Sequence, residues 1–355
     1  MTAAAVDSDS PVAHMQGVTL RRSVAAYGFS WRKRSLVRAF TGVANVQFVS
    51  RAHDVHEGAD LLLWGSADAP AGLPAQVRVI RLEDGFLRSV GLGADLVRPA
   101  SWVIDASGIY YDPRTPSDLE TLLQTMRFSA NQLQRASVFG QQLVQSGLTK
   151  YNLTGAPWSR PTAELSVVLV VGQVETDASI ATGTVDVKTN LALLQAVRKA
   201  RPGAWIVYKP HPDVVAKLRG SGADEHLASQ WANEILANGS MAQILQAVDE
   251  VHVMTSLAGF EALLRYKPVY CYGQPFYAGW GLTHDRHSHL RRTRRLTLNE
   301  LIAGCLLIYP VYVSLKTGLR CNAEQALTEL LALRVQSPAT LPWWRRVLRP
   351  LLARP

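Results

Sequence analysis

Two polar motifs in the second half of the chain contain residue types that bind phosphate, and the first is KPHPD at residues 209–213. Its two prolines favour an extended turn after a run rich in β-branched and aromatic residues. Lys209 supplies a fixed charge and His211 a directional donor, which suits a phosphate or a departing phosphoryl group. The alternative is a turn with two exposed basic residues, and the rigidity imposed by the prolines favours the functional interpretation.

The second motif, TSLAGFEALL at residues 255–264, has the pattern of a helix start after an apolar run. Ser256 can cap the helix, and the backbone N–H groups of the first turn can bind an anion. Glu261 could accept hydrogen bonds from ribose hydroxyls. Capping and dipole complementation would explain the motif taken alone, but beside KPHPD it favours a nucleotide site. The chain has neither a dinucleotide-binding glycine motif nor a P-loop motif.

Each half of the chain also has an acidic loop after an apolar run. VGQVETDASI contains Gln173, Glu175 and Asp177, and EDGFLRS contains Glu83, Asp84 and Arg88. An ordinary acidic loop is the alternative for each. Two carboxylates across a cleft suit glycosyl chemistry, because one attacks or stabilises the anomeric carbon while the other transfers a proton. An arginine beside them would bind a substrate carboxylate or phosphate.

These motifs are expected at the carboxyl ends of parallel strands, where open sheets bind ligands. Short apolar runs predict strands at residues 23–29, 46–50, 60–65, 77–83, 165–172, 205–209, 251–255 and 268–273. Periodic segments predict helices at 116–145, 186–200, 240–248, 257–266, 296–307 and 323–334, and residues 102–112 are predicted as a hairpin or two short strands. The alternation predicts an α/β fold with two doubly wound, Rossmann-like domains that face a cleft.

The domain limits follow from the same patterns. The boundary is placed in the turn-forming segment TGAPWSRPT at residues 154–162. The predicted parts are a disordered tail at 1–20, an N-terminal domain at 21–155, a C-terminal domain at 156–310, and closing helices with a basic Trp/Arg tail at 311–355.

Composition narrows the class of protein. The 355 residues include 37 Lys or Arg and 28 Asp or Glu, for a net charge of +9. Cys271, Cys305 and Cys321 form no CxxC pair, so a reducing cytoplasm is expected. The N-terminus lacks the pattern of a signal peptide, and no run approaches the ~18 apolar residues of a spanning helix. The positive charge could bind nucleic acid, an anionic membrane or a phosphorylated substrate.

Two basic segments favour an anionic membrane as the partner of this positive charge. The tail LPWWRRVLRPLLARP pairs Trp343 and Trp344 with arginines, a composition typical of an anionic membrane interface. The arginines of residues 286–295 would add to this attraction. No nucleic-acid reader module is recognisable, so nucleic-acid binding is disfavoured.

Several long motifs together resemble one known family. EDGFLRSVGLGADLVRP, GIYYD, VGQVETDASI, YKPHPD, TSLAGFEALL and KPVYCYGQPFYAGWGLTHDR are similar to segments of the KpsC-type capsule polysaccharide Kdo transferases of Gram-negative bacteria. The similarity runs in order from about residue 24 to 310. GFSWRKR and QVETDAS resemble the carboxyl-terminal module of the usual two-module protein. This chain has one module, which leaves the linkage and the order of addition open.

The resemblance implies a GT-B-like, retaining glycosyltransferase. It would use CMP-β-Kdo to extend the Kdo linker on a lysophosphatidylglycerol-type glycolipid in capsular polysaccharide biosynthesis. The first domain would be on the acceptor side, and the second would bind the CMP-sugar. Asp177 would be the nucleophile that forms a glycosyl-enzyme intermediate, and Glu83 the acid/base. The residues implied to bind the nucleotide sugar are Lys209, His211, Ser256, Glu261, Gln173, Arg88, Thr255 and Gly259.

No metal or cofactor is expected, because no DxD-like triplet is present and Lys209 and His211 can neutralise the departing phosphate. The expected partners are CMP-Kdo, a Kdo-primed glycolipid acceptor, an anionic membrane and capsule-assembly proteins, at a cytoplasmic location peripheral to the inner membrane. A transferase of another nucleotide-activated sugar and a noncatalytic capsule-assembly or lipid-binding factor are the alternatives. The linkage formed, β-(2→4) or β-(2→7), stays open.

Overall fold

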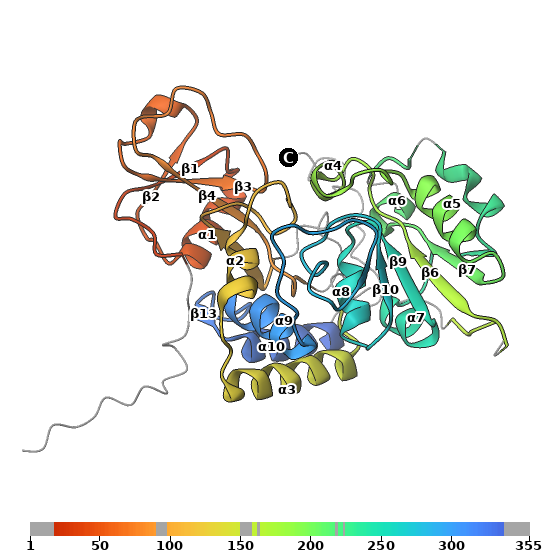
Figure 1. Cartoon of the computed structure of the whole chain (residues 1–355). Coiled ribbons are helices and arrows are strands. Elements are labelled where there is room, and N and C mark those ends of the chain that lie inside the picture. The colour runs from red at the N-terminus through yellow and green to blue at the C-terminus, as the bar shows by residue number, and fades with distance from the viewer. Residues whose placement is uncertain are drawn as a thin grey trace, which may run out of the picture.

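Two β-sheets organise the protein, one built mainly from the first third of the chain and the other from the second half (Figure 1). The structure, a computed structural model, describes residues 18–89, 98–149, 158–161, 164–216, 219–222 and 224–336. Within these residues the first sheet has seven strands in the order β13-β12-β5-β4-β3-β1-β2. The second has six, in the order β11-β10-β9-β6-β7-β8.

The first sheet combines a parallel part and an antiparallel part. Its parallel strands are β1 (Val24–Tyr27), β2 (Val46–Val49), β3 (Asp60–Trp64) and β4 (Arg78–Asp84). Antiparallel pairs add β5 (Ser101–Asp105), β12 (Pro310–Val313) and β13 (Arg320–Cys321). The four strands predicted in the first half are confirmed, with ends that differ by no more than two residues.

Every strand pair recorded in the second sheet is parallel. Its strands are β6 (Val167–Val171), β7 (Trp205–Lys209), β8 (Glu234–Ile235), β9 (Glu250–Val253), β10 (Val269–Cys271) and β11 (His284–Asp285). All residues of β6 and β9 are buried, as expected for strands covered on both faces. The four strands predicted in this half are confirmed.

One long helix was expected at residues 116–145, and this prediction is wrong in its continuity. The structure has α2 (Asp118–Thr125) and α3 (Ala130–Ser146). Ser129 and Gln132 form a capping box, in which each side chain accepts a hydrogen bond from the backbone N–H of the other residue. Because a capping box marks a helix start, the chain begins a new helix at this point.

The second strand expected within residues 102–112 is absent from the described chain, since only β5 forms there. The Asp105 carboxylate accepts hydrogen bonds from the backbone N–H of Ser107 at 3.0 Å and of Gly108 at 2.8 Å. It also accepts one from Asp118 N at 3.0 Å. An Asp side chain bound to nearby backbone competes with a strand ladder, so residues 106–112 form a loop.

The remaining helices lie around the sheets. They are α1 (Trp31–Thr41), α4 (Ala178–Gly183), α5 (Asn190–Ala200), α6 (Pro212–Val215), α7 (Met241–Ala247), α8 (Leu257–Leu263), α9 (Leu298–Ile302) and α10 (Ala323–Gln336). A π-helical stretch, η4 (Ala303–Ile308), continues α9, and 3-10 turns form at η1 (Ala52–Asp54) and η3 (Glu225–Gln230). The helix predicted at 186–200 begins later, because Thr189 caps it.

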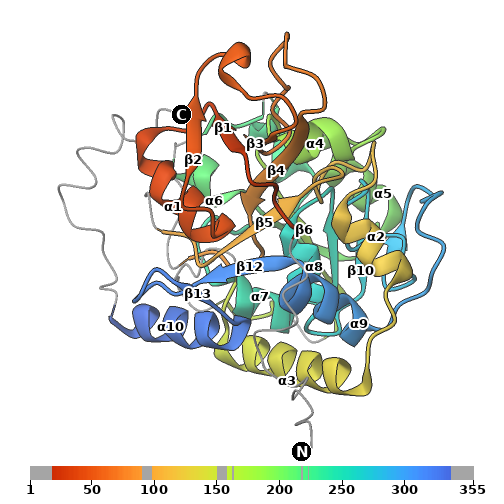
Figure 2. The same ribbon diagram turned by 90° about the vertical axis from the view of Figure 1, so that its left-hand side faces the viewer.

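The chain after residue 310 returns to the first sheet. It was expected to contribute closing helices and a tail, but it also supplies β12 and β13, and Pro310 pairs with Val103 of β5. Figures 1 and 2 both place α3 and α10 side by side beneath the sheets. The largest hydrophobic cluster draws on both sheets, for example through Val103 and Leu169. The domain limits stay a prediction, because the segment at 154–162 lies largely outside the described residues.

Candidate functional site

The polar segments after β6, β7 and β9 meet at one edge of the second sheet. β6 and β7 end together, since Val171 pairs with Lys209, and β9 lies on the other side of β6. Asp177, His211 and Ser256 therefore follow three neighbouring parallel strands at the edge where such sheets bind ligands. The structure thus brings the predicted residues of the second half to the same region.

Gln173 and Thr255 hold the ends of β6 and β9 together. Thr255 N donates to Gln173 Oε1 at 2.8 Å, and Gln173 Nε2 donates to Thr255 Oγ1 at 3.0 Å. The backbone N–H of Gln173 donates to Asn190 Oδ1, and Asn190 Nδ2 donates to the carbonyl O of Gln173, both at 2.9 Å. Gln173 was predicted to contact the donor sugar, whereas here its amide is bound within the protein.

Asp177 directly precedes α4, but its side chain makes no capping hydrogen bond. Among the described residues, none forms a hydrogen bond or ion pair with its carboxylate. Helix α4 is tightly packed, because a Cβ built on Gly183 would lie 2.9 Å from Thr255 Cγ2 and 3.6 Å from Tyr111 O. The position of Asp177 is thus set by a helix that lies between the end of β9 and a loop of the first half.

Lys209 and His211 are positioned by the end of β7. Lys209 is 8% exposed and its Nζ donates to Leu236 O at 3.4 Å. Burial lowers the pKa of the Lys209 ammonium. His211 caps α6 with its Nδ1, which accepts from Asp213 N at 3.2 Å. With Nδ1 as acceptor, a neutral ring has its proton on Nε2, which can donate to an anion.

Ser256 and Gly259 fix the start of α8. The Ser256 hydroxyl accepts from Ala258 N at 3.3 Å, and its carbonyl oxygen accepts from the Tyr277 hydroxyl at 2.5 Å. A Cβ on Gly259 would overlap the Tyr277 hydroxyl, so a side chain at 259 would displace this helix. Both predicted residues therefore have a structural role, and their contact with a nucleotide stays a prediction.

Glu261 lies further along α8 and is 8% exposed. It lines a small hollow together with Phe86, Leu148 and Thr149 of the first half. The carbonyl oxygen of Glu261 accepts a hydrogen bond from Arg265 Nη1 at 2.8 Å. Glu261 is thus placed between the two halves of the chain.

The end of β4 carries the charges of the first half. Asp84 and Arg88 form an ion pair at 2.5 Å, and both side chains are less than one-fifth exposed. The Nζ atom of Lys33, from α1, lies 3.6 Å from the centre of the Trp64 ring. Burial lowers the pKa of Lys33 and outweighs the attraction of Asp84 and Glu83. Arg88, predicted to bind a substrate carboxylate, already has a carboxylate partner within the protein.

Tyr111 connects the two halves at this point. A Cβ built on Gly65 would lie 2.6 Å from Tyr111 Oη and 3.0 Å from Glu83 Oε2, so both groups approach the same backbone position. The carbonyl oxygen of Tyr111 accepts a hydrogen bond from Thr182 Oγ1 of α4 at 3.3 Å. Burial and the charge of Glu83 raise the pKa of Tyr111 to about 12. One loop therefore links the sheet that carries Glu83 to the helix that follows Asp177.

Sequence reasoning did not select Lys33, Tyr111 or Asn190 as site residues. Lys33 lies in GFSWRKR and Tyr111 in GIYYD, two segments that resemble a known family, and this resemblance was the available signal. Asn190 had no such signal, because its partner Gln173 lies 17 positions earlier in the chain.

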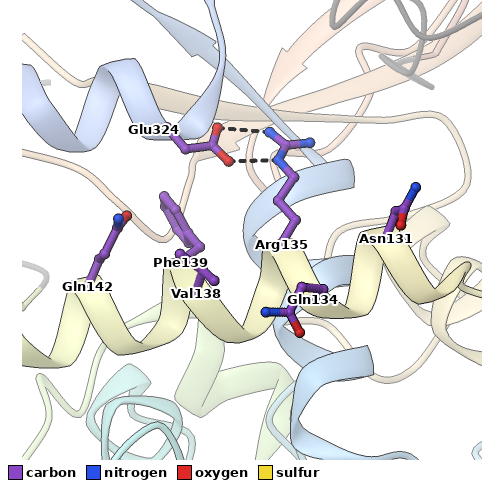
Figure 3. Close-up of a pocket in the computed structure, with 7 residues that line it drawn as sticks. All are labelled: Asn131, Gln134, Arg135, Val138, Phe139, Gln142 and Glu324. Atoms are coloured by element: carbon purple, nitrogen blue, oxygen red, sulfur yellow. Dashed lines mark hydrogen bonds and ion pairs between the residues drawn. The ribbon is translucent and has the colours of Figure 1, made fainter.

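A separate hollow of about 370 Å³ lies along α3 (Figure 3). Figure 3 shows Arg135 of α3 facing Glu324 of α10, joined by two hydrogen bonds of 2.6 and 2.8 Å. The two charges neutralise each other, and the hollow contains none of the predicted site residues. The lining residues are Asn131, Gln134, Arg135, Val138, Phe139, Gln142 and Glu324.

The described residues contain neither a metal-binding cluster nor a membrane-spanning helix. No group of three or more His, Cys, Asp or Glu side chains in this part of the chain could hold a metal ion. No helix in the described ranges is both long and apolar enough to cross a bilayer. The tail with Trp343 and Trp344, predicted to contact a membrane, lies outside the described residues.

The family of capsule polysaccharide biosynthesis proteins matches residues 60–154 and 158–312, which include Glu83, Asp177 and Lys209. The chain belongs to this family. It is 41% identical over 322 residues to the capsule polysaccharide modification protein LipA of Neisseria meningitidis serogroup A / serotype 4A, covering 88% of this chain and 46% of LipA. It is 37% identical over 340 residues to the lipopolysaccharide-processing protein LpsZ of Rhizobium meliloti, covering 92% of this chain and 76% of LpsZ. The chain therefore spans about half the length of LipA.

Two solved structures from Thermosulfurimonas dismutans KpsC are similar in fold. The one described as a beta Kdo 2,7 transferase has a TM-score of 0.73 and 40% identity, covering 88% of this chain and 99% of that one. The one described as a beta Kdo 2,4 transferase has a TM-score of 0.77 and 30% identity, covering 88% and 98%. These matches confirm the predicted GT-B-like α/β fold and the resemblance to KpsC.

Proposed function

We propose that this capsule-family protein is a retaining glycosyltransferase. It transfers β-Kdo from CMP-β-Kdo to a Kdo-primed, lysophosphatidylglycerol-type glycolipid in capsular polysaccharide biosynthesis. The two similar structures from KpsC are described as Kdo transferases, which supports Kdo as the sugar. One observation carries the proposal: Glu83 and Asp177 come from different sheets, and the loop at Tyr111 contacts both the surroundings of Glu83 and the helix after Asp177.

In the first step, Asp177 is the nucleophile. Its carboxylate oxygen bonds to the anomeric carbon of Kdo, and the bond from that carbon to the CMP phosphate oxygen breaks, with the electron pair leaving on the phosphate. Support comes from a carboxylate that has no partner among the described residues, at the edge where parallel sheets bind ligands. Lys209 and His211 neutralise the departing phosphate without a metal ion.

In the second step, an acceptor hydroxyl attacks the anomeric carbon and the bond to Asp177 breaks. Glu83 accepts the proton of that hydroxyl. Two displacements at the same carbon retain its configuration, as in other transferases and hydrolases with a glycosyl-enzyme intermediate. Tyr111 is proposed to position Glu83, because its hydroxyl and the carboxylate approach the same glycine.

The remaining contacts bind the donor. Ser256, Thr255 and the backbone amides up to Gly259 contact the phosphate, and Glu261 binds the ribose hydroxyls. Gln173 and Arg88 contact the Kdo hydroxyls or carboxylate in addition to their partners within the protein, which are Thr255 and Asp84. The proposed location is cytoplasmic and peripheral to the inner membrane, where the lipid acceptor and capsule-assembly proteins would be encountered.

Direct transfer tests this function. The protein is incubated with CMP-Kdo generated in situ and a synthetic Kdo-primed acceptor, and the product linkage is determined by NMR. Parallel reactions contain UDP-sugars. We expect one β-linked Kdo to be added from CMP-Kdo and nothing from UDP-sugars. Transfer from a UDP-sugar, or an α-linked product, would contradict the proposal.

A further inference from the structure

Helix α1 presents an aromatic and basic stripe to solvent. Trp31, Arg34 and Arg38 are spaced by three, four and seven positions and so share one face of the helix. All three are exposed, Trp31 to 75%. The other face carries Val37 and Phe40, which are fully buried and pack against the first sheet. We call Trp31, Arg34 and Arg38 the α1 stripe.

Within the described part of the chain, the cations of the α1 stripe have no carboxylate partner. Among the described residues, no ion pair includes Arg32, Arg34 or Arg38, and α1 has no acid in its first turn. The guanidinium groups of Arg34 and Arg38 lie 4.9 and 5.0 Å from the centre of the Phe48 ring, which holds both on the surface. Residues 18–60 contain seven Lys or Arg and only three Asp or Glu.

The basic segment at residues 286–295 differs from the α1 stripe, because most of its arginines have carboxylate partners. Four of the five arginines between residues 286 and 295 form ion pairs with carboxylates of the protein. These four arginines share the carboxylates of Asp186, Glu120 and Glu300, so most of their charge is compensated, although the sequence predicted that this segment contacts a membrane. An external anionic surface would meet more uncompensated charge at the α1 stripe.

We propose that the α1 stripe docks the protein onto the anionic headgroups of a lipid bilayer. Each cation near such a surface strengthens binding, and a tryptophan at the edge of the stripe suits the headgroup region. Figure 2 shows α1 at the outer edge of the molecule, with no other labelled helix covering it. The proposed catalytic site is also close to α1, because the charge of Glu83 influences the pKa of Lys33, which lies on this helix. Docking would therefore bring the acceptor-side carboxylate toward the bilayer, a consequence that rests on the proposed function.

A nucleic acid is the competing polyanion, and two observations favour lipid over it. The stripe contains two exposed arginines and one exposed tryptophan on a helix of 11 residues, a small footprint for a phosphate backbone. Trp31 is the residue that a bilayer interface accommodates best. A nucleic-acid site is therefore an outcome that the test must be able to detect.

Vesicle co-sedimentation tests the docking surface. The full chain is mixed with vesicles of phosphatidylglycerol and phosphatidylcholine, or of phosphatidylcholine alone. We expect binding only to the anionic vesicles and a roughly 20- to 30-fold weaker partition for Arg34→Gln/Arg38→Gln, since each cation contributes roughly fivefold. Arg34→Lys/Arg38→Lys keeps the charge and should retain most of the binding. Lys188→Gln/Lys199→Gln removes the same charge from exposed positions of the second half and should bind like the parent.

The outcomes separate this proposal from its rivals. Thermal unfolding of each variant verifies the fold, because Arg34 and Arg38 contact Phe48. Equal vesicle binding by Arg34→Gln/Arg38→Gln and the parent would overturn the proposal. Equal losses of binding in Arg34→Gln/Arg38→Gln and Lys188→Gln/Lys199→Gln would also overturn it. A loss of duplex DNA binding with unchanged vesicle binding would assign the stripe to nucleic acid instead. The vesicle assay contains neither the CMP-Kdo donor nor a glycolipid acceptor. It therefore measures docking alone, and a failure of docking can be distinguished from a failure of Kdo transfer.

Discussion

Thr255 N donates to Gln173 Oε1 at 2.8 Å, while Gln173 Nε2 donates back to Thr255 Oγ1 at 3.0 Å. The two residues are 82 positions apart in the chain and follow β6 and β9. Because Asp177 and Ser256 lie just beyond them, this pair sets the spacing between the proposed nucleophile and the proposed phosphate-binding turn. An amide that sequence reasoning assigned to the substrate therefore supports the site from within the protein.

Gln173→Leu should destabilise the protein. The substitution leaves the Thr255 N–H without its acceptor and breaks the second bond, and a buried unsatisfied donor costs roughly 1–3 kcal/mol. Urea unfolding measures this loss. Gln142→Leu changes an exposed glutamine and should stay within about 0.5 kcal/mol of the parent. Equal stability of the two variants would show that the pair does not hold the strand ends together.

Asp177→Asn should abolish transfer while binding of the donor persists. Loss of a nucleophile lowers turnover by more than about 10³-fold, whereas CMP affinity depends on other residues. Radiolabelled transfer and CMP titration measure the two effects. Glu175→Gln is the matched control, because the Glu175 carboxylate accepts from Asn190 N at 2.7 Å and has a structural role. Turnover by Asp177→Asn at the parent rate would contradict the assignment.

Tyr111→Phe should lower turnover about tenfold with little change in the acceptor KM, because a small displacement of a catalytic group is costly. The pKa of Tyr111 is raised to about 12 by burial and by Glu83, so the hydroxyl remains protonated beside the carboxylate. Its removal should also shift the pH profile of turnover. Tyr272→Phe, at the residue that follows β10, should leave the turnover and its pH profile unchanged. A Tyr111→Phe profile that matches the parent would remove Tyr111 from the account.

Donor affinity should decline at an unusually low alkaline pH. Burial lowers the pKa of Lys209 from its ordinary value of 10.5, so its charge is present below the lowered pKa and lost as the pH rises through it. CMP titration calorimetry across the alkaline range measures this decline. Lys209→Arg keeps its charge throughout and should show no such decline. The same decline in Lys209→Arg would mean that another group is responsible.

Acid should weaken the fold through Glu250. Burial alone would raise the Glu250 pKa, but hydrogen bonds from His252 and Arg201 outweigh it and lower the pKa from 4.5 to about 2. The ionised carboxylate therefore stabilises the folded state above pH 4.5, and this contribution is lost as the pH falls from 4.5 toward 2. Stability curves for the parent and Glu250→Gln should converge over this window. Curves that stay parallel would contradict this linkage.

The strands were predictable where the pattern is local. VVLVV of β6 and WIVYK of β7 are apolar enough to identify buried strands without knowledge of their neighbours. β12 was missed because its partner β5 lies about 200 positions earlier, and a four-residue strand after a helix has no local signal. The extra strand expected in GIYYD does not form, because the Asp105 side chain binds nearby backbone N–H groups.

The positions of the candidate site residues were likewise predictable where the sequence pattern is local. Strand ends and motifs placed Lys209 and Glu83 at the ends of β7 and β4 and Asp177 in the loop after β6, and all three lie there, while their catalytic and binding roles stay predictions. The partners of a side chain were not predictable, because the Gln173 contact with Thr255 and the Tyr111 contact with α4 join distant segments. Arg88 is a different case, because its partner Asp84 lies only four positions earlier in the same EDGFLRS segment.

Trapping the covalent intermediate tests the central claim most directly. Glu83→Gln is incubated with CMP-Kdo and an acceptor, and the intact mass and the peptide map are measured. The account predicts a mass gain of one Kdo on the peptide that contains Asp177, and no gain in the variant that also carries Asp177→Ala. An equal mass gain in that double variant, or Kdo transfer by Asp177→Ala at the parent rate, would contradict it.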